Sequence, residues 1–184
     1  DRYTSATPAS EPQPAMIFAF GGGFVGGTRD RDFYYPYFQH LAENGIVVVS
    51  IDYRLGLKNL PSDNGMVDMI GYMNNAVNIA VEDMYSATNF LITNAKEWNI
   101  DTSKIMVSGS SAGAITALQA EWLRDQEAEL AKVLPEGFRY AGVVSCAGAL
   151  FSTKGRPKFS GNAAPMLLFH GTSDSNVPYN KASI

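Results

Sequence analysis

A serine stands at the centre of a pentapeptide whose spacing suits nucleophilic catalysis. Residues Gly109 to Gly113 read G-S-S-A-G and fit G-x-S-x-G with Ser111 in the middle. An apolar run precedes the motif, and an Ala- and Leu-rich run follows it. A sharp strand-to-helix turn would present the Ser111 hydroxyl at a helix N-terminus, where backbone N–H groups favour developing negative charge. The alternative is a glycine-rich turn that holds an incidental serine.

Three consecutive glycines form a second candidate site. The run Gly21–Gly23 directly follows an apolar stretch that ends at Phe20, and Phe24 comes next. Backbone N–H groups without side chains beside them can point into a cavity, and acyl transfer needs such donors around the oxyanion. The alternatives are a flexible turn or a phosphate-binding loop. The chain has no G-x-x-x-x-G-K-[ST], and Asp52 lies farther along than the ~20 residues of a dinucleotide-binding fingerprint.

An acidic residue follows the last apolar run. The segment His170–Pro178 reads H-G-T-S-D-S-N-V-P and places Asp174 just beyond that run. Loops at the carboxyl ends of parallel strands collect catalytic groups, and in the order Ser, Asp, His the acid comes after the nucleophile. Asp174 is therefore the candidate acid. The alternative is an Asx turn that only shapes the loop.

The elements that must position these motifs alternate along the chain. Five apolar runs are predicted to be strands: Ala15–Phe20, Gly45–Tyr53, Lys104–Ser110, Tyr140–Ala147 and Ala164–His170. Three segments are predicted to be helices: Phe33–Asn44, Ala76–Trp98 and Ser111–Lys132. Strands alternating with helices predict an α/β fold, with a mostly parallel, twisted sheet covered by helices on both faces.

Together the three motifs resemble the α/β-hydrolase superfamily, in particular its esterase and lipase branch, which includes carboxylesterases and carbohydrate esterases. The resemblance extends from about Ala15 to Pro178 and includes the less specific stretch Gly45–Arg54. It implies that Ser111 becomes acylated and that Asp174 is the triad acid. It also implies an oxyanion hole and substrate contacts nearby, formed respectively by the backbone of Gly22, Gly23 and Ala112 and by Phe24 and Ser110. Two positions depart from the family pattern, because relatives often have histidine at Phe20 and an acidic residue at Ser110.

The triad base is the unresolved part of this interpretation. The chain has two histidines. His170 matches a family histidine that shapes the acid loop, and His40 precedes the nucleophile in a predicted helix. In the family the base follows one further strand after the acid. We therefore expect residues 1–14 to be an N-terminal loop and residues 15–184 to be a hydrolase core. We expect that core to be incomplete at both ends and to lack the C-terminal strand with the catalytic histidine.

Composition limits the other functions. The 14 basic and 18 acidic residues give a net charge of −4, and the absence of a basic run argues against nucleic-acid binding. No apolar stretch reaches the ~18–20 residues of a membrane span. One cysteine, Cys146, excludes an intrachain disulfide and is interpreted as a buried structural thiol. Asp30, Asp32, Asp63 and Asp68 lack metal-ligand spacing with His or Cys, so no metal or organic cofactor is expected.

Two further segments remain open to interpretation. Tyr34, Tyr35 and Tyr37 crowd one segment after the glycine run and fit either core packing or an acyl or sugar pocket. Leu57–Asn75 is less periodic and fits a cap over the site. The sequence thus predicts a serine esterase acting on a small-molecule or carbohydrate ester, without fixing its compartment or oligomeric state. The alternative is a non-catalytic binding protein with the same fold.

Overall fold

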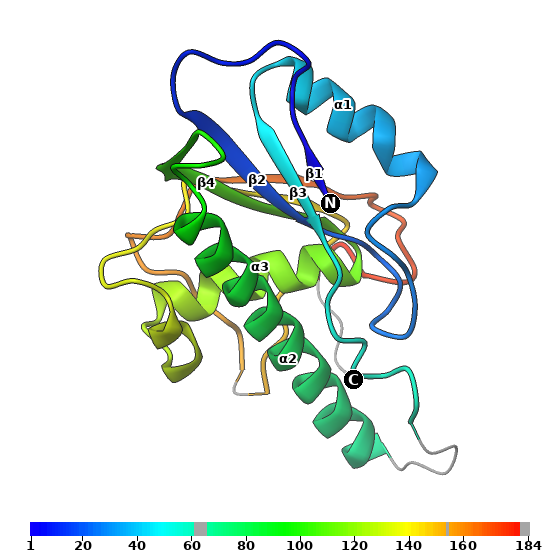
Figure 1. The fold of residues 1–184 in the computed structure, drawn as a ribbon. Helices are drawn as coiled ribbons and strands as arrows, with labels where there is room; N and C mark the ends of the chain where they lie inside the picture. The colour runs from blue at the N-terminus through cyan, green and yellow to red at the C-terminus, as the bar shows by residue number, and fades with distance from the viewer. Residues whose placement is uncertain (61–65, 154, 181–184) are drawn as a thin grey trace.

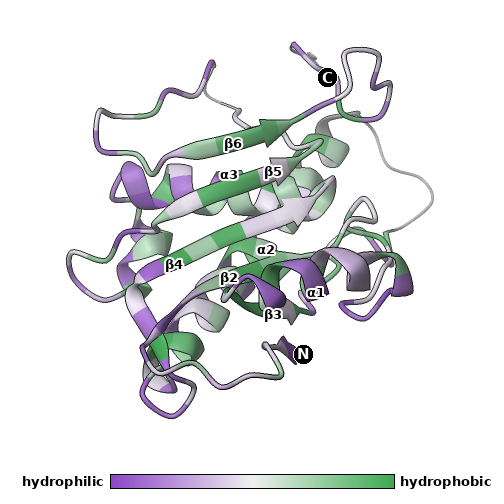
Figure 2. Cartoon of the chain, turned by 90° about the horizontal axis from the view of Figure 1, so that it is seen from above, coloured by the Kyte–Doolittle hydropathy of each residue, from purple (hydrophilic) through white to green (hydrophobic). Residues whose placement is uncertain are grey.

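The strands that precede the predicted motifs lie in one sheet. The structure is a computed structural model that describes residues 1–60, 66–153 and 155–180. In this part of the chain six strands pair in the order β1-β3-β2-β4-β5-β6. Figure 1 labels β1 to β4, and Figure 2 labels β2 to β6. Their bounds are Arg2–Tyr3 for β1, Gln13–Ala19 for β2, Val47–Ile51 for β3, Ile100–Ser110 for β4, Gly142–Cys146 for β5 and Met166–Phe169 for β6. β1 runs antiparallel to β3, and all the other neighbours are parallel.

The central strands are apolar on both faces because helices cover both sides of the sheet. α1 (Tyr35–Glu43) lies on one face, where Phe38 packs against Phe18 of β2 with ring centroids 5.0 Å apart. α2 (Met66–Thr93) and α3 (Ala112–Asp125) lie on the other face (Figure 2). Two short 3-10 helices, η1 (Asp32–Tyr34) and η2 (Glu129–Val133), precede α1 and follow α3. The predicted fold class is confirmed.

Each predicted strand and helix is present, with shifted ends. The buried residues Val77, Val81, Met84, Tyr85 and Leu91 lie along the inner side of α2, as their helical spacing predicts. α3 ends at Asp125 rather than at Lys132, and residues up to Lys132 fall partly in η2. The short strand β1, within the expected N-terminal loop, was missed because two residues carry no periodic pattern. Cys146, expected to be a buried thiol, is half-buried. This burial raises the pKa of its thiol.

The segment Leu57–Asn75, which fits a cap in the sequence, is helical in its second half. From Met66 onward the residues form the first turns of α2. Residues 61–65, in the middle of the segment, lie outside the described residues. Residues 66–75 are therefore helical, and the hypothesis that the segment covers the site stays a prediction.

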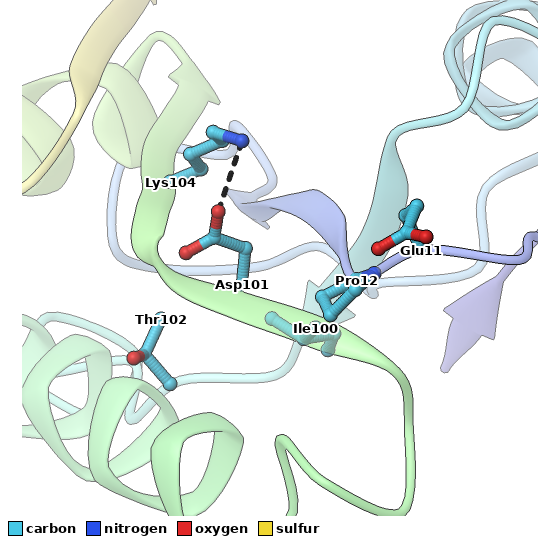
Figure 3. A pocket seen from close by; sticks show the side chains of 6 residues that line it. All are labelled: Glu11, Pro12, Ile100, Asp101, Thr102 and Lys104. Atoms are coloured by element: carbon cyan, nitrogen blue, oxygen red, sulfur yellow. Dashed lines mark ion pairs between the residues drawn. The ribbon is translucent and has the colours of Figure 1, made fainter.

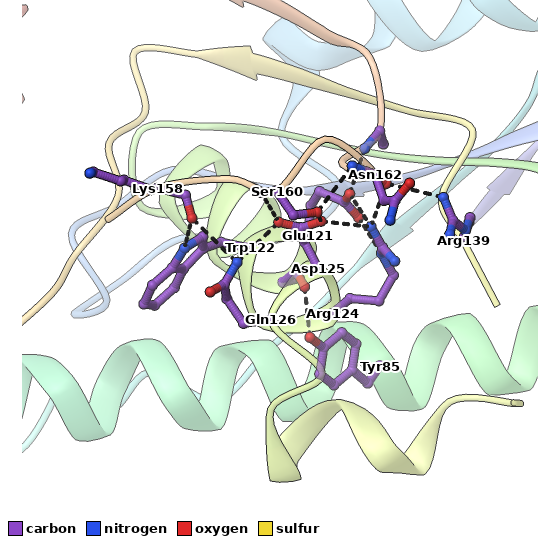
Figure 4. Close-up of polar contacts among 12 residues, drawn as sticks. Tyr85, Glu121, Trp122, Arg124, Asp125, Gln126, Arg139, Lys158, Ser160 and Asn162 are labelled. Atoms are coloured by element: carbon purple, nitrogen blue, oxygen red, sulfur yellow. Dashed lines mark hydrogen bonds and ion pairs between the residues drawn. The ribbon is translucent and has the colours of Figure 1, made fainter. Parts of the chain in front are cut away.

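A buried carboxylate ties α3 to the loop that leads into β6 (Figure 4). Glu121 is 0% exposed, and its Oε1 accepts hydrogen bonds from Arg124 Nη2 and from the backbone N–H of Ala164, both at 2.6 Å. Arg124 Nε donates to Oε2 at 2.8 Å. Nearby, Asp125 accepts bonds from the backbone N–H and the hydroxyl of Ser160. These bonds fix the approach of β6 to the sheet.

Candidate active site

The three predicted motifs all follow strands at the carboxyl-terminal edge of the parallel sheet. The ends of the strands are in register through the pairs Ala19–Gly109, Ser110–Cys146 and Cys146–Phe169. The glycine turn after β2, the serine turn after β4 and the acidic loop after β6 therefore leave the sheet from one edge. The Ser111 N–H also donates to the Cys146 carbonyl at 2.8 Å, which fixes the serine turn to β5.

Ser111 has the strained backbone that its motif predicts. Its φ of 51° and ψ of −119° lie in a region that glycine adopts more readily than any other residue. Its carbonyl accepts a hydrogen bond from the Ile115 N–H at 2.9 Å, so α3 begins directly at the serine. The flanking glycines are required by space. A Cβ on Gly109 would lie 2.3 Å from the carbonyl carbon of Gly113, and one on Gly113 would lie 2.0 Å from the Ala19 carbonyl oxygen.

The glycine turn lies directly against the serine. A Cβ on Gly21 would be 3.2 Å from the Cβ of Ser111 and 2.9 Å from the Ser110 carbonyl oxygen. Gly22 has φ +148°, and its carbonyl accepts hydrogen bonds from Val25 at 3.1 Å and Gly26 at 3.2 Å. Gly23 has φ +62°.

Two N–H groups of this turn, those of Gly22 and Gly23, lack a protein acceptor in the described part of the chain. The N–H of Ala112 also has no intrahelical acceptor, since it belongs to the first turn of α3. These are the three groups that the sequence analysis assigned to an oxyanion hole.

The two predicted substrate contacts differ in their surroundings. Phe24 is 1% exposed, and its ring packs edge-on against Tyr53 with centroids 6.2 Å apart. Its side chain therefore belongs to the core, and the expectation that it touches a substrate needs correction. The position of Phe24 directly after the glycines does not determine which way its ring points. Ser110 is partly exposed and pairs with Cys146 at the end of the sheet.

Asp174 forms a turn within its own loop. Its Oδ1 accepts hydrogen bonds from the N–H groups of Val177 and Asn176, both at 2.9 Å. These two hydrogen bonds lower the pKa of the Asp174 carboxyl, and the one from Val177 has the larger effect. Its other oxygen, Oδ2, is 3.7 Å from His170 Nε2. The Asx turn that the sequence left as an alternative is therefore present, and it leaves Oδ2 without a backbone partner among the described residues.

The two histidines have other surroundings than a triad base needs. His170 Nε2 donates to the Val177 carbonyl at 2.7 Å, and its ring packs edge-on against Tyr179. His40 lies in the last turn of α1 and is exposed. Among the described residues neither histidine is hydrogen-bonded to Ser111.

The tyrosines after the glycine turn divide between two environments. Tyr34 is buried, and its hydroxyl accepts a hydrogen bond from the Gly21 N–H at 3.1 Å. Tyr37 is half-buried against Met16, and Tyr35 is exposed. Another buried tyrosine, Tyr53, donates to the Phe20 carbonyl at 2.8 Å. Tyr53 could not be singled out from the sequence, because the residue follows a strand and no spacing connects it to the glycines.

Two hollows lie at opposite ends of the sheet. One of about 350 Å³ lies beside the acidic loop and is lined by Leu118, Ser145, Gly148, Leu168, Phe169, His170, Tyr179 and Asn180. The other, of about 530 Å³, lies by the start of β4 and is lined by Glu11, Pro12, Ile100, Asp101, Thr102 and Lys104 (Figure 3). An ion pair between Lys104 and Asp101, at 2.9 Å, forms part of its wall. This second hollow is remote from Ser111.

The described residues contain no group of three or more His, Cys, Asp or Glu side chains that could hold a metal ion. None of the helices in the described part of the chain is both long and apolar enough to cross a membrane.

Residues 1–149 match the family model BD-FAE. The chain belongs to the BD-FAE family. Its match includes the glycine turn and the serine turn, and ends before β6. This membership confirms the resemblance to α/β-hydrolase esterases that the motifs indicated.

Named esterases are among the curated relatives. Esterase B1 of Culex pipiens is 31% identical over 121 residues, which cover 66% of this chain and 21% of that protein. Fumonisin B1 esterase of Sphingopyxis macrogoltabida is 32% identical over 109 residues, which cover 55% of this chain and 18% of that protein. The chain thus spans about a fifth of the length of these relatives.

Solved structures of an esterase share the fold. Esterase 2 of Thermogutta terrifontis, with propionate bound, superposes with a TM-score of 0.72 at 26% identity. The superposition covers 97% of this chain and 68% of the esterase. The sheet and helices of this BD-FAE family member are therefore those of an α/β-hydrolase esterase.

Proposed function

We propose that this chain carries the nucleophile and the oxyanion site of a serine hydrolase that acts on carboxylic esters. The proposal rests chiefly on one observation. The glycine turn, whose N–H groups at Gly22 and Gly23 have no acceptor among the described residues, lies against Ser111. Such preorganised donors stabilise a tetrahedral oxyanion. Membership of the BD-FAE family and the similarity to named esterases support the same reaction.

The reaction proceeds through an acyl-enzyme. Ser111 Oγ attacks the ester carbonyl carbon, and its proton passes to a general base. The carbonyl oxygen becomes an oxyanion held by the N–H groups of Gly22, Gly23 and Ala112. The C–O bond to the alcohol then breaks, and the alcohol leaves with the proton from the base. Water repeats the sequence on the acyl-enzyme and releases the carboxylic acid and free Ser111.

The acid and the base of the triad have different support. Asp174 lies at the same sheet edge as Ser111, is held as a carboxylate by backbone N–H groups, and has Oδ2 free of backbone partners among the described residues. It is our candidate for the acid that orients the base. His40 and His170 are both poorly placed as the base. We therefore assign the base to a histidine that these 184 residues do not contain.

Short-chain acyl esters are the proposed substrates. The Thermogutta esterase binds propionate, a short carboxylate. The names of the curated relatives share the word esterase and do not share one alcohol component. Sugar acetates and simple alkyl acetates share the reacting carbonyl, so one panel of both types tests whether the alcohol part is read. Equal kcat/KM for a sugar acetate and its alkyl counterpart would indicate that carbohydrate is not recognised.

The experiment is hydrolysis of 4-nitrophenyl propionate by the full-length protein. Ser111→Ala should lower kcat to the level of roughly 10³–10⁴-fold over water that binding and oxyanion donors alone provide. His40→Ala should leave kcat unchanged. The 184 residues alone should hydrolyse little ester. If the 184 residues alone hydrolyse the ester and His40→Ala abolishes that hydrolysis, our assignment of the base is wrong. A full-length protein that does not hydrolyse the ester would favour the non-catalytic alternative.

A pair of glycines in one turn tests whether catalysis depends on the backbone conformation of that turn. A Cβ on Gly22 would lie 1.8 Å from the Gly26 carbonyl oxygen, whereas one on Gly26 would meet nothing within 4 Å. Gly22→Ala should therefore lower kcat by at least ~10²-fold, and Gly26→Ala should leave it nearly unchanged. Gly23→Ala should fall between them, because its φ is unfavourable but its space is open. Equal kcat in the Gly22 and Gly26 variants would reject this turn as the oxyanion site.

A further inference from the structure

Two buried tyrosine hydroxyls hold the two polar ends of one peptide unit. The Tyr53 hydroxyl donates to the Phe20 carbonyl at 2.8 Å, and the Gly21 N–H donates to the Tyr34 hydroxyl at 3.1 Å. That carbonyl and that N–H belong to the same peptide bond. Because a trans peptide is planar and its C=O and N–H point in opposite directions, the two tyrosines approach it from opposite sides. Together they resist its rotation about the chain axis.

The tyrosines come from separate elements and are themselves fixed. Tyr34 ends η1, is 8% exposed, and packs edge-on against Phe18 with ring centroids 4.7 Å apart. Tyr53 follows β3, is 6% exposed, and stacks on Phe20 at 4.6 Å. Burial raises the pKa of the Tyr53 phenol, so the hydroxyl keeps its proton and remains a donor.

The held peptide is the one that leads into the glycine turn. Gly21 lies against Ser111, and the next two residues supply the N–H groups proposed for the oxyanion. Glycine has no side chain to restrict its backbone, so the orientation of these N–H groups must be imposed from outside the run. Downstream, the Phe24 carbonyl accepts a hydrogen bond from the Leu57 N–H at 3.0 Å. The run is therefore anchored at both ends, and the tyrosines supply the upstream anchor.

We infer that Tyr34 and Tyr53 are positioning residues for the oxyanion site: they hold the Phe20–Gly21 peptide so that the following N–H groups point at the substrate carbonyl. This inference rests on the proposed function, because it assigns these tyrosines a part in that reaction. Neither side chain is required to touch the substrate. Their effect is on the transition state, since the oxyanion forms only there.

The test compares Tyr34→Phe, Tyr53→Phe and the double variant in the full-length protein. Tyr140→Phe is the matched control, because Tyr140 is also buried and its hydroxyl is hydrogen-bonded, to Thr88 at 2.8 Å. Each loop variant should lower kcat about tenfold on 4-nitrophenyl propionate with KM nearly unchanged. The double variant should lose little more than the worse single variant, because both hydroxyls hold one peptide unit. Tyr140→Phe should keep the wild-type kcat.

Two measurements distinguish a positioning role of the tyrosines from a general loss of stability: affinity for an inhibitor that forms a tetrahedral adduct, and amide hydrogen exchange. Affinity for a trifluoromethyl ketone, which forms an oxyanion on the serine, should fall by the same factor as kcat/KM. Amide exchange of residues 20–27 should quicken in Tyr34→Phe and not in Tyr140→Phe. If a variant folds poorly, this exchange measurement on the other single variant still decides.

The outcomes distinguish the two proposals. An inactive wild-type enzyme that is not labelled at Ser111 would refute the proposed function and this inference with it. An active wild type whose two tyrosine variants keep kcat, or change KM alone, would refute only the positioning role. Losses in the two single variants that multiply in the double variant would also contradict it, because independent effects would mean that the hydroxyls do not act on one peptide.

Discussion

The backbone of Gly113 lies so close to that of Ala19 that a Cβ on the glycine would be 2.0 Å from the alanine carbonyl oxygen. Gly113 is in the first turn of α3, and Ala19 is the last residue of β2. The contact therefore brings the helix that begins at Ser111 onto the strand that leads into the glycine turn. The distance between nucleophile and oxyanion donors depends on this approach.

Gly113→Ala should consequently destabilise the protein by at least about 2 kcal/mol, since neither backbone can yield without moving its element. Gly71→Ala is the control, because Gly71 lies within α2 and its Cβ would meet nothing within 4 Å. That change should raise stability by up to about 1 kcal/mol, the usual gain for alanine over glycine in a helix. Urea unfolding of both variants measures the difference. Equal effects would mean that α3 and β2 are not in close contact.

The strained backbone conformation of Ser111 leads to a second prediction about stability. Its backbone conformation costs about 1–3 kcal/mol for a residue with a side chain, and glycine adopts it freely. Ser111→Gly should therefore be more stable than Ser111→Ala by about 1 kcal/mol, although both remove the hydroxyl. Thermal unfolding of the pair tests this. A less stable glycine variant would indicate that the turn is relaxed.

The parallel sheet and its helices could be predicted from the sequence because buried strands are continuous apolar runs. The predicted strand Gly45–Tyr53 contains all of β3, and the predicted strand Lys104–Ser110 covers most of β4. The first turns of α2, from Met66, could not be predicted in this way. Their apolar residues are interrupted by Gly71 and do not follow one clear period. The helix extends back to Met66 from later turns that are buried.

The serine turn was predictable because its local geometry demands small residues. Gly109 and Gly113 are forced by backbone contacts, which is why the serine motif is visible in the sequence. The tyrosines that hold the Phe20–Gly21 peptide are separated by a whole strand and helix, and only the fold brings them together. The burial of Phe24 was also not readable, because nothing in the sequence shows that its ring turns toward Tyr53.

The buried ion pair of Glu121 and Arg124 should contribute more to stability than the exposed ion pair of Glu129 and Lys132, which has the same i,i+3 spacing. Glu121→Gln would leave Arg124 with only the longer ion pair to Asp125, at 3.9 Å, and should cost about 2–3 kcal/mol. Glu129→Gln is the matched control, since Glu129 pairs with Lys132 but its side chain is 86% exposed. It should change stability by less than about 0.5 kcal/mol.

Limited proteolysis provides a second measure of that network. Glu121 holds the N–H of Ala164, so Glu121→Gln should speed cleavage within residues 155–164, while Glu129→Gln should not. Unchanged cleavage together with unchanged unfolding would contradict the anchoring role of Glu121.

Asp174 should contribute stability that depends on pH. Its pKa is lowered below the ordinary value of 3.8 by the N–H groups of Val177 and Asn176. A group with a depressed pKa in the folded state contributes stability above its unfolded pKa and loses it as pH falls through the folded pKa. Wild type should therefore lose more stability than Asp174→Asn on acidification below about pH 4. Unfolding midpoints measured from pH 2 to 6 test this, and parallel curves would count against the bonded carboxylate.

The most direct test of the account is the site of covalent labelling by a fluorophosphonate in the full-length protein. Ser111 Oγ should attack phosphorus, fluoride should leave, and mass spectrometry should find the phosphonyl group on Ser111. The label should be absent from Ser111→Ala and present at the wild-type rate in His40→Ala. Labelling of Ser110 instead, or labelling that persists in Ser111→Ala, would contradict the assignment of Ser111 as the nucleophile.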